Sequence, residues 1–277
     1  MPTPVSPFLR EAARRVLVFD GAMGTSIHAR NLDVQTDYCG CENCTDVIVR
    51  TRPDVVREIH ESFLAAGADA VETDTFGASR HVLGEFGLSA ETFELNRAAS
   101  EVARAACAAH ATPDRPRFVV GSIGPGTKLI TLGNIGWGAM LESYREQARG
   151  LLAGPPGAHA TAAAGAGVDA FCIETCQDLL QAKCAINAVL EALHERRLTP
   201  EQVPIMVSVT IETSGAMLLG TQIEAAATAL AGYPICCLGL NCATGPTEMS
   251  EHVRWLGRHW GIGATAGRVV SVMPNAG

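Results

Sequence analysis

The sequence lacks several features that define large classes of proteins. Its 277 residues carry a net charge of −8, only 5% of them are aromatic, and no basic run occurs. These properties argue against a nucleic-acid-binding surface. No stretch approaches the roughly 20 uninterrupted apolar residues of a membrane span. Residues 1–8 contain neither the basic block nor the apolar block of a secretory signal peptide. We therefore expect neither nucleic acid nor membrane among the partners of this chain.

Cysteine, in contrast, is abundant, and apolar residues make up 47% of the chain, enough for a sizeable core. Most of the ten cysteines fall inside strand or helix patterns, where a free thiol behaves as a small buried hydrophobe rather than as part of a disulfide framework. A reducing compartment, the cytoplasm, fits this usage. The cysteines in such patterns are Cys107, Cys172, Cys184, Cys236 and Cys237.

Short runs rich in valine and isoleucine alternate with longer amphipathic stretches, a pattern typical of βα units. Such units predict a parallel sheet covered by helices. In residues 53–64, for example, apolar side chains recur at helical spacing; Pro53 suits the first turn and Gly67 suits the end of the helix. The predicted strands are Val16–Asp20, Asp69–Thr75, Phe118–Gly124, Asp169–Thr175, Pro204–Ile211, Ile235–Cys242 and Arg268–Asn275.

Seven such units predict a single α/β domain over residues 1–277. A TIM-type (β/α)8 barrel needs about 250 residues, so we expect such a barrel truncated before its eighth strand. An open doubly wound sheet remains an alternative, but no glycine fingerprint follows the first strand. Residues 154–166, rich in glycine, alanine and proline, are interpreted as a flexible insertion without chemistry.

The candidate site residues lie at strand ends, because parallel barrels place their chemistry there. Cys242 ends an apolar strand, and its thiolate is a strong zinc ligand. The glycines of the Asp20–Thr25 turn let backbone N–H groups approach a ligand carboxylate. The residues of that turn assigned to binding are Asp20, Gly21, Ala22, Met23 and Gly24.

Carboxylates end two further strands. Glu72 and Asp74 are predicted to share one face, since side chains alternate along a strand. Glu174 is positioned to bind a substrate ammonium group, or alternatively to cap the following helix.

Other polar residues are weaker candidates. Cys236 and Cys237 lie roughly 15–20 Å along the strand from Cys242, too far to share a metal with it. The cysteines of the loop after the first strand form a C-x-C-x₂-C pattern that is a rival metal site, although no second pair follows at finger-like spacing. These are Cys39, Cys41 and Cys44. His60 and His81 are interpreted as ordinary helix-associated residues.

The strand-end segments together resemble the homocysteine S-methyltransferase family, and most closely the amino-terminal homocysteine-binding modules of cobalamin-dependent methionine synthases. The resemblance runs from about Val16 to the last residue and implies a (β/α)8 barrel. The segments that carry it are 20–25, 72–76, 173–178, 204–211, 239–243 and 274–277. At position 74 the family usually has asparagine, where this chain has Asp74.

The resemblance also implies a mechanism. Zinc held by three cysteines activates the homocysteine thiol; Cys242 is one ligand, and the two from a later Cys-Cys segment are absent from this chain. A free thiol is only about 3% ionised at pH 7, which makes such activation necessary. Glu174 would hold the substrate ammonium, backbone around Ala22 and Met23 its carboxylate, and Asn241 and Asn275 would complete the site.

We therefore expect a module that methylates homocysteine to methionine, with methylcobalamin on a separate domain and methyltetrahydrofolate as its source of methyl groups. A stand-alone enzyme using betaine or S-methylmethionine is an alternative, as is a non-catalytic homocysteine-binding fragment. Because the two later cysteines are absent, we expect this chain by itself to be inactive and to bind zinc weakly or not at all.

Overall fold

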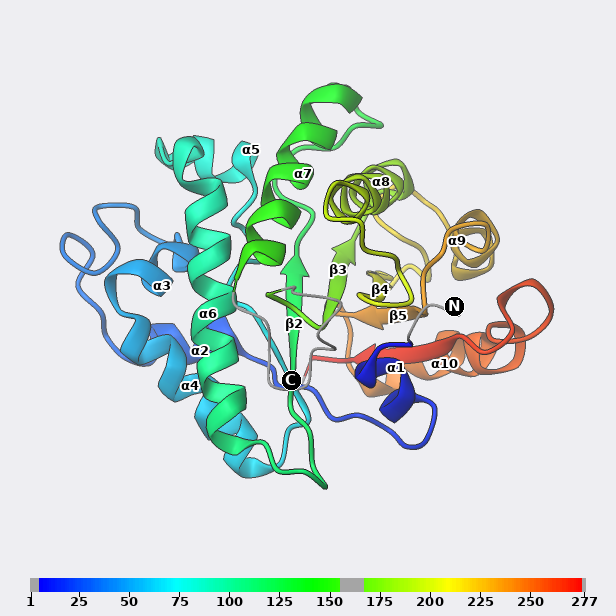
Figure 1. The fold of residues 1–277 in the computed structure, drawn as a ribbon. Coiled ribbons are helices and arrows are strands. Elements are labelled where there is room, and N and C mark those ends of the chain that lie inside the picture. The colour runs from blue at the N-terminus through cyan, green and yellow to red at the C-terminus, as the bar shows by residue number, and fades with distance from the viewer. Residues whose placement is uncertain (1–4, 155–166, 276–277) are drawn as a thin grey trace.

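The structure, a computed structural model, describes residues 5–154 and 167–275. Its centre is a curled half-barrel of six parallel strands that follow one another in chain order, with helices around the outside (Figure 1). Parallel strands must be joined by crossovers, and here each crossover carries helix. The strands are β1 (Ala70–Glu72), β2 (Phe118–Ile123), β3 (Ala170–Cys176), β4 (Ile205–Val209), β5 (Cys237–Asn241) and β6 (Val269–Met273).

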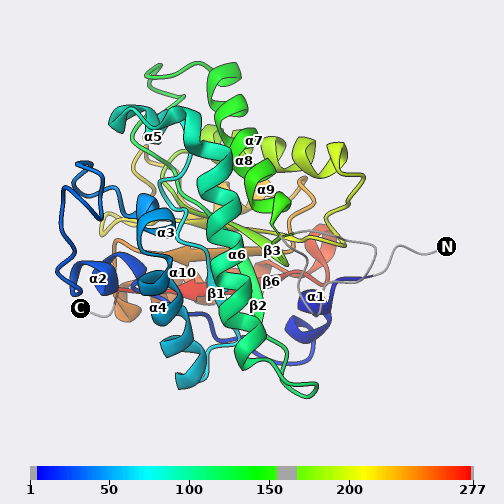
Figure 2. The ribbon, with the colours of Figure 1, turned by 60° about the vertical axis from the view of Figure 1, so that its left-hand side comes forward.

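The longer helices cover the outer face of the sheet. Figure 2 shows α4 and α6 side by side over β1 and β2, and α7, α8 and α9 continue the layer along the sheet. The α-helices are α1 (Pro7–Ala12), α2 (Met23–His28), α3 (Ile48–Thr51), α4 (Pro53–Ala66), α5 (Arg80–Leu83), α6 (Thr92–His110), α7 (Trp137–Ala153), α8 (Leu179–Glu195), α9 (Ile223–Leu230) and α10 (Pro246–His259). Short 3₁₀ turns occur at Thr45–Val47, Gly84–Phe86, Ser89–Glu91 and Gly263–Thr265.

Helix α4 has the boundaries that its sequence predicts. Pro53 occupies the first turn, where its missing N–H is not needed. Gly67 ends the helix with a φ of 119°, and its N–H bonds to the carbonyls of Phe63 and Leu64. Glycine adopts this left-handed conformation far more readily than residues with a side chain. The local sequence therefore determines where the helix ends.

The first predicted strand is the main departure from expectation. Residues 16–20 do not form a strand; they make a single parallel bridge, between Phe19 and Ala70. The Val18 carbonyl accepts the N–H groups of Asp69 and Ala70, at 2.7 and 3.2 Å. Two backbone donors at this junction bond to side chains instead of to a ladder partner: the Val18 N–H to Asp69 and the Glu72 N–H to Asp20. Seven strands were predicted and six are described, so the prediction was wrong for this first strand.

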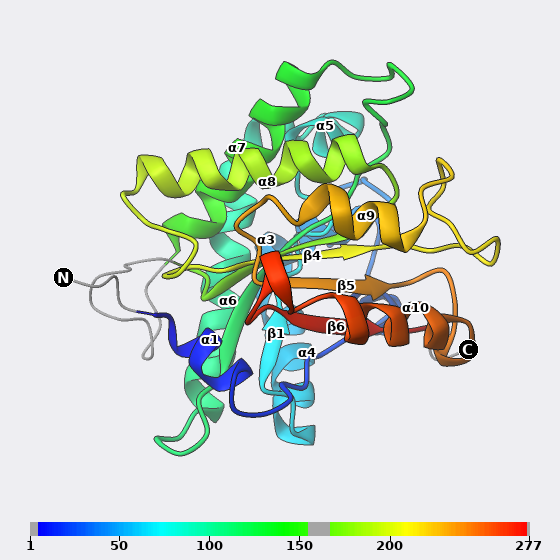
Figure 3. The same cartoon turned by 90° about the vertical axis from the view of Figure 1, so that its right-hand side faces the viewer.

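A cavity of about 690 Å³ lies where further strands would close the barrel. It is lined on one side by the 16–20 segment and on the other by β6, with α1 at one end. Figure 3 shows α1 and β6 on the side of the molecule that faces the viewer. Val16 and Val272, on the two flanks, are 84% and 49% exposed. The expected gap beside the first segment is therefore present, and both flanks offer unpaired edges.

The inner face of the half-barrel is packed with apolar side chains around Phe8 of α1. The Phe8 ring meets Phe118 edge-on with centroids 5.5 Å apart, a favourable aromatic geometry. Cys172 and Cys237 belong to this inner layer, which confirms that they are buried. A second, larger cluster fills the space between the outer face and helices α6 to α9.

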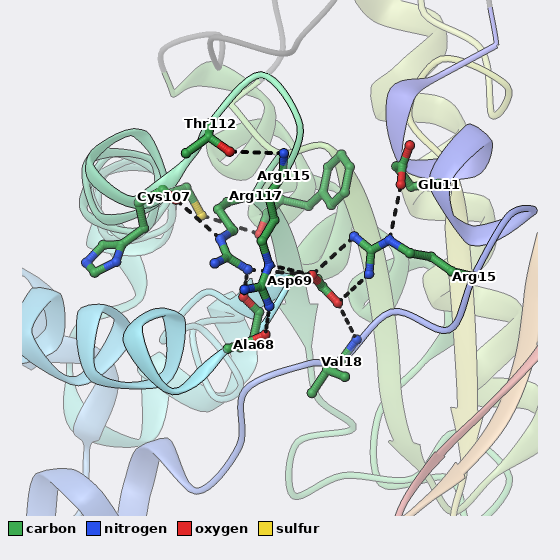
Figure 4. Close-up of polar contacts among 12 residues, drawn as sticks. Glu11, Arg15, Val18, Ala68, Asp69, Cys107, Thr112, Arg115 and Arg117 are labelled. Carbon is green, nitrogen blue, oxygen red and sulfur yellow. Dashed lines mark hydrogen bonds and ion pairs between the residues drawn. The ribbon is translucent and has the colours of Figure 1, made fainter.

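A buried carboxylate, Asp69, ties the first segment to the sheet (Figure 4). It accepts hydrogen bonds from the Val18 N–H at 3.0 Å and from Arg15 Nη1 at 2.8 Å. Arg117 and Arg115 add ion pairs at 3.5 and 3.7 Å. Burial alone would raise the pKa of Asp69, but these bonds and charges hold it below its ordinary value.

A similar aspartate–arginine arrangement occurs one hundred residues later in the chain. Asp169 Oδ2 accepts the Val119 N–H and Arg104 Nη1, both at 2.8 Å. The two matching sequences at 67–70 and 167–170 thus make matching connections, each with an aspartate at the amino end of its strand. A charge-assisted bond to the preceding element, the 16–20 segment in one case and β2 in the other, fixes the register at both places.

Two further observations complete the fold. No helix within the described residues has both the length and the apolar character required to cross a membrane. Most of the stretch interpreted as an insertion, residues 155–166 of 154–166, lies outside the described residues.

Asp69→Asn should lower the free energy of unfolding by about 3 kcal/mol, because it leaves the buried Arg117 guanidinium without its countercharge. Glu251→Gln is the matched control: Glu251 pairs with the largely exposed Arg254, and its loss should cost no more than about 1 kcal/mol. Since the pKa of Asp69 is lowered by folding, its contribution is present above the unfolded pKa and is lost as pH falls. Urea unfolding at pH 7 and pH 3.5 measures both effects; equal losses for the two variants would contradict the assignment.

Candidate functional site

Four of the predicted site residues line one end of the cavity. Asp20, Glu72, Glu174 and Asn241 come from the first segment, β1, β3 and β5, each at the carboxyl end of its element. They converge because parallel strands end at the same rim. This is the face on which barrel folds place their ligands.

Glu174 is the best-anchored of these carboxylates. The Ser122 hydroxyl at the end of β2 donates to its Oε1 at 2.5 Å, and Asn241 Nδ2 donates to its Oε2 at 3.2 Å. Burial raises the pKa of Glu174 to about 7, and the Asp20 carboxylate adds to the increase while the Ser122 bond opposes it. The carboxylate is thus oriented by two neighbouring strands.

Asn241 links this carboxylate to the predicted zinc ligand. Its amide nitrogen also lies 3.4 Å from Cys242 Sγ and 2.7 Å from Thr175 Oγ1. Thr175 Oγ1 is in turn 3.7 Å from the same sulfur. Burial raises the pKa of the half-buried Cys242 thiol, whereas the Thr175 hydrogen bond lowers it. An acid, an amide and a thiol therefore form one connected group.

The backbone around this group is strained. Of the eight described non-glycine residues with left-handed φ values, three follow or end β3 and β5 and one precedes α2: 55° at Thr175, 59° at Cys242, 56° at Ala243 and 52° at Ala22. For a β-branched residue such as Thr175 this is a rare conformation. Strain of this kind costs of order 1–3 kcal/mol per residue and clusters at functional sites. The observation supports a ligand site independently of the side-chain chemistry.

Asp20 fixes the loop that follows the first segment. Its Oδ1 accepts the Glu72 N–H at 2.9 Å, and its Oδ2 lies 3.5 Å from His60 Nδ1 on α4. Burial raises the pKa of Asp20, and the His60 contact partly opposes the increase. His60 is fully buried. His60 therefore contacts Asp20 from the side away from the cavity, and its role is not limited to helix packing.

The remaining predicted residues lie outside the cavity lining. The Gly21–Gly24 turn begins α2, next to Asp20 at the rim. Asn275 is exposed, and its N–H bonds to the Thr244 carbonyl just beyond Cys242.

Asp74 was predicted to share a face with Glu72, and this was wrong. β1 ends at Glu72, and the chain then turns, with the Thr75 N–H bonded to the Thr73 carbonyl. Strand alternation therefore does not reach position 74. Asp74 is instead buried near Asp46, which raises its pKa in addition to the larger effect of burial.

Asp46 and Asp74 are two buried acids without a cationic partner among the described residues. Burial raises the pKa of Asp46 to about 6, although the Gly77 N–H donates to it at 2.9 Å. Asp74 Oδ2 has no hydrogen-bond partner in the described part of the chain. Two neighbouring buried carboxyls disfavour each other's ionisation.

The thiols do not assemble into a metal site within the described residues, where no group of three histidine, cysteine or acidic side chains could hold a metal ion. Cys39 is exposed, Cys41 is half-buried, and Cys44 is buried in a cluster with α3 and α4. Burial and the Asp46 charge raise the pKa of Cys44 to about 12. All ten cysteines are free thiols. At the rim, Cys242 therefore stands as a single thiol ligand.

Sequence reasoning missed four residues of the site. Ser122 and Thr175 lie at or near predicted strand ends, so the strand-end signal that found Glu174 was available for them. Cys172 lies two residues before Glu174 and therefore shares its inward face. His60 gave no such signal, because its contact depends on how α4 packs behind the first segment.

Fold and site together define an α/β half-barrel with a polar ligand site at the carboxyl ends of its strands. The chain belongs to the homocysteine S-methyltransferase family, whose model matches residues 17–277.

Two curated relatives are methionine synthases. That of Mycobacterium tuberculosis is 43% identical over 265 residues, which are 96% of this chain and 20% of that protein. That of Mycobacterium leprae is 42% identical over 269 residues, 97% of this chain and again 20% of the relative. The chain thus spans about a fifth of the length of these proteins.

Solved structures show the same fold. The metallated form of the homocysteine methyltransferase MmuM from Escherichia coli superposes with a TM-score of 0.72 at 22% identity, covering 98% of this chain and 88% of that one. The apo form gives a TM-score of 0.64, again at 22% identity, over 94% and 91% of the two chains. The predicted barrel-type α/β fold is therefore confirmed.

Asp74→Asn should stabilise the protein increasingly as pH rises. Folding raises the pKa values of Asp46 and Asp74. The folded protein is therefore most stable at low pH, where both acids are protonated, and it loses stability as pH rises through their folded pKa values. An amide cannot ionise, so the variant should match the wild type near pH 3.5, below the unfolded pKa, and exceed it by about 1–2 kcal/mol at pH 8. Thermal unfolding across this range is the measurement, with the exposed Asp114→Asn as control. A variant that loses stability at pH 8 would contradict the buried acid pair.

Proposed function

We propose that this chain is the homocysteine-binding module of a methionine synthase, a methyltransferase that converts homocysteine to methionine. The observation that carries the proposal is the connected group of Glu174, Asn241 and Cys242 at the strained rim of a cavity, in a chain of this family. The similarity to two methionine synthases supports the choice of reaction.

The site divides into parts that suit the three functional groups of homocysteine. Glu174, with Asp20 nearby, offers negative charge for the ammonium group. Backbone N–H groups of the turn around Ala22 and Met23 suit the carboxylate. The substrate sulfur would then lie beside Cys242, at the end of β5.

Ser122 and Asn241 keep Glu174 in place rather than binding the substrate themselves. Each donates one hydrogen bond to a different carboxylate oxygen, which fixes the plane of the group before the ligand arrives. A preorganised acceptor binds an ammonium group without first having to be ordered. Asp20, held by the Glu72 N–H, places the turn that would receive the substrate carboxylate.

Zinc is part of this proposal only through Cys242. A bound zinc ion would supply a reactive substrate thiolate at neutral pH. Cys242 is the one ligand that the described residues offer at the rim, so they do not by themselves fit a three-thiolate site. Two further ligands would have to come from outside the described residues. The metallated form of the Escherichia coli homocysteine methyltransferase is consistent with metal use in such a site.

The methyl donor is the least constrained part of the proposal. The methionine synthase relatives are about five times longer than this chain, which favours a donor such as methylcobalamin carried on another domain and charged from methyltetrahydrofolate. A free donor, betaine or S-methylmethionine, is the same-class alternative, and the fold likeness to a shorter homocysteine methyltransferase leaves room for it. We place the protein in the cytoplasm, in keeping with its ten free thiols.

A non-catalytic homocysteine-binding fragment is the alternative of another class. The half-barrel is open along one side in the described residues, which is compatible with binding but not by itself with a closed reaction chamber. Methyl transfer by the 277-residue chain supplied with zinc and methylcobalamin would exclude this alternative.

Glu174→Gln should weaken homocysteine binding at least tenfold, because a charge-assisted hydrogen bond contributes about 1.5–3 kcal/mol. Isothermal titration calorimetry of the 277-residue chain at pH 8 measures the affinity directly. Glu191→Gln, at a half-buried position of α8 that pairs with Arg145 and lies outside the cavity lining, is the control and should bind as the wild type does. Equal affinities for the wild type and Glu174→Gln would contradict the proposed ammonium site.

A further inference from the structure

Three carboxyl groups share the end of the cavity proposed for the substrate ammonium: Asp20, Glu72 and Glu174. Arg15 is the one arginine or lysine in the described lining, and it is bonded to Asp69 at the amino end of β1. His60 approaches only Asp20, from the far side. The empty site would therefore carry several negative charges with little compensation if all three acids were ionised.

The hydrogen bonds are distributed unequally among the three acids. Asp20 receives the Glu72 N–H and faces His60. Glu174 receives the Ser122 hydroxyl and the Asn241 amide. Glu72 Oε1 is buried and has no hydrogen-bond partner among the described residues. Donors stabilise the ionised form of a carboxyl group, so Glu72 is the acid least suited to being charged.

We propose that Glu72 holds a proton in the ligand-free site and releases it when the ammonium group of the substrate enters among the three carboxyls. This rests on the proposed function, because the entering ligand is an α-amino acid. In the exchange the ammonium keeps its protons, the Glu72 O–H bond breaks, and the proton passes to solvent. The bound state then pairs an ammonium with a carboxylate rather than with a neutral acid.

The surroundings of Glu72 agree with this role. Burial raises the pKa of Glu72 well above its ordinary value, and the charges of Glu174 and Asp20 add to the increase. Cys172 on β3 is a weak thiol donor to Glu72 and opposes the increase only in part. An entering cation removes the repulsion that keeps the proton in place, so binding and deprotonation favour each other.

Two consequences follow for recognition. Affinity for the amino acid should increase with pH over the range in which Glu72 would otherwise remain protonated, since proton and ammonium compete for the same place. The site should also reject analogues with a hydroxyl in place of the amine, because these bring no charge to replace the proton.

The test uses L-methionine, the proposed product, which has no thiol proton to release. Calorimetric titration of the 277-residue chain at pH 8, where Glu174 with its pKa of about 7 is mostly ionised, in phosphate and in Tris, buffers of different ionisation enthalpy, gives the number of protons released. We expect about one proton per ligand for the wild type and close to none for Glu72→Gln. Glu191→Gln is the control and should match the wild type. Undiminished release in Glu72→Gln would overturn the proposal.

A second measurement needs no ligand. Because the pKa of Glu72 is raised by folding, the protonated acid stabilises the protein at low pH, and this contribution is lost as pH rises through the folded pKa. Glu72→Gln should therefore lose less stability than the wild type between pH 6 and pH 9, and identical profiles would overturn the assignment of the proton to Glu72. If methionine does not bind at all, the proposed function and the release step both fail, while the stability profile still decides where the proton is held.

Discussion

The attachment of one short segment to the sheet supports the rest of the site. Residues 16–20 form only one bridge, yet they carry Asp20 and lead into the Gly21–Gly24 turn. Two carboxylates hold this segment: Asp69 binds the Val18 N–H at its start, and Asp20 binds the Glu72 N–H at its end. Each bond joins a side chain to the backbone between this segment and β1, and so replaces ladder hydrogen bonds that a full strand would have made.

This attachment determines the electrostatics of the cavity. It brings Asp20 to within a short distance of Glu72 and Glu174, and burial then raises the pKa of all three acids. Unpaired buried charges are costly, so an empty site of this kind must retain protons or admit a cation. An amino acid whose ammonium group enters the carboxyl cluster satisfies that requirement. The strained backbone at Thr175 and Cys242 holds the neighbouring thiol at the same rim.

Sequence alone predicts the part of this arrangement that follows from parallel strands. Glu72, Glu174 and Asn241 were recognisable because each ends an apolar run, and parallel strands end at one rim. The position of Asp74 was not predictable, since it depends on a turn that stops β1 at Glu72. The contact of His60 with Asp20 depends on helix packing between segments forty residues apart in the chain. The loss of the first strand was not predictable either, because it depends on Asp69 and Asp20, whose side chains bond backbone donors at this junction.

The central claim is that homocysteine binds at the carboxyl ends of the strands with its ammonium group in the carboxyl cluster. A crystal structure of the 277-residue chain with homocysteine tests it most directly. The account predicts the amino nitrogen within about 3 Å of a Glu174 oxygen and the sulfur next to Cys242. Homocysteine bound instead at the opposite end of the cavity, beside Phe8 and Arg15, would contradict it.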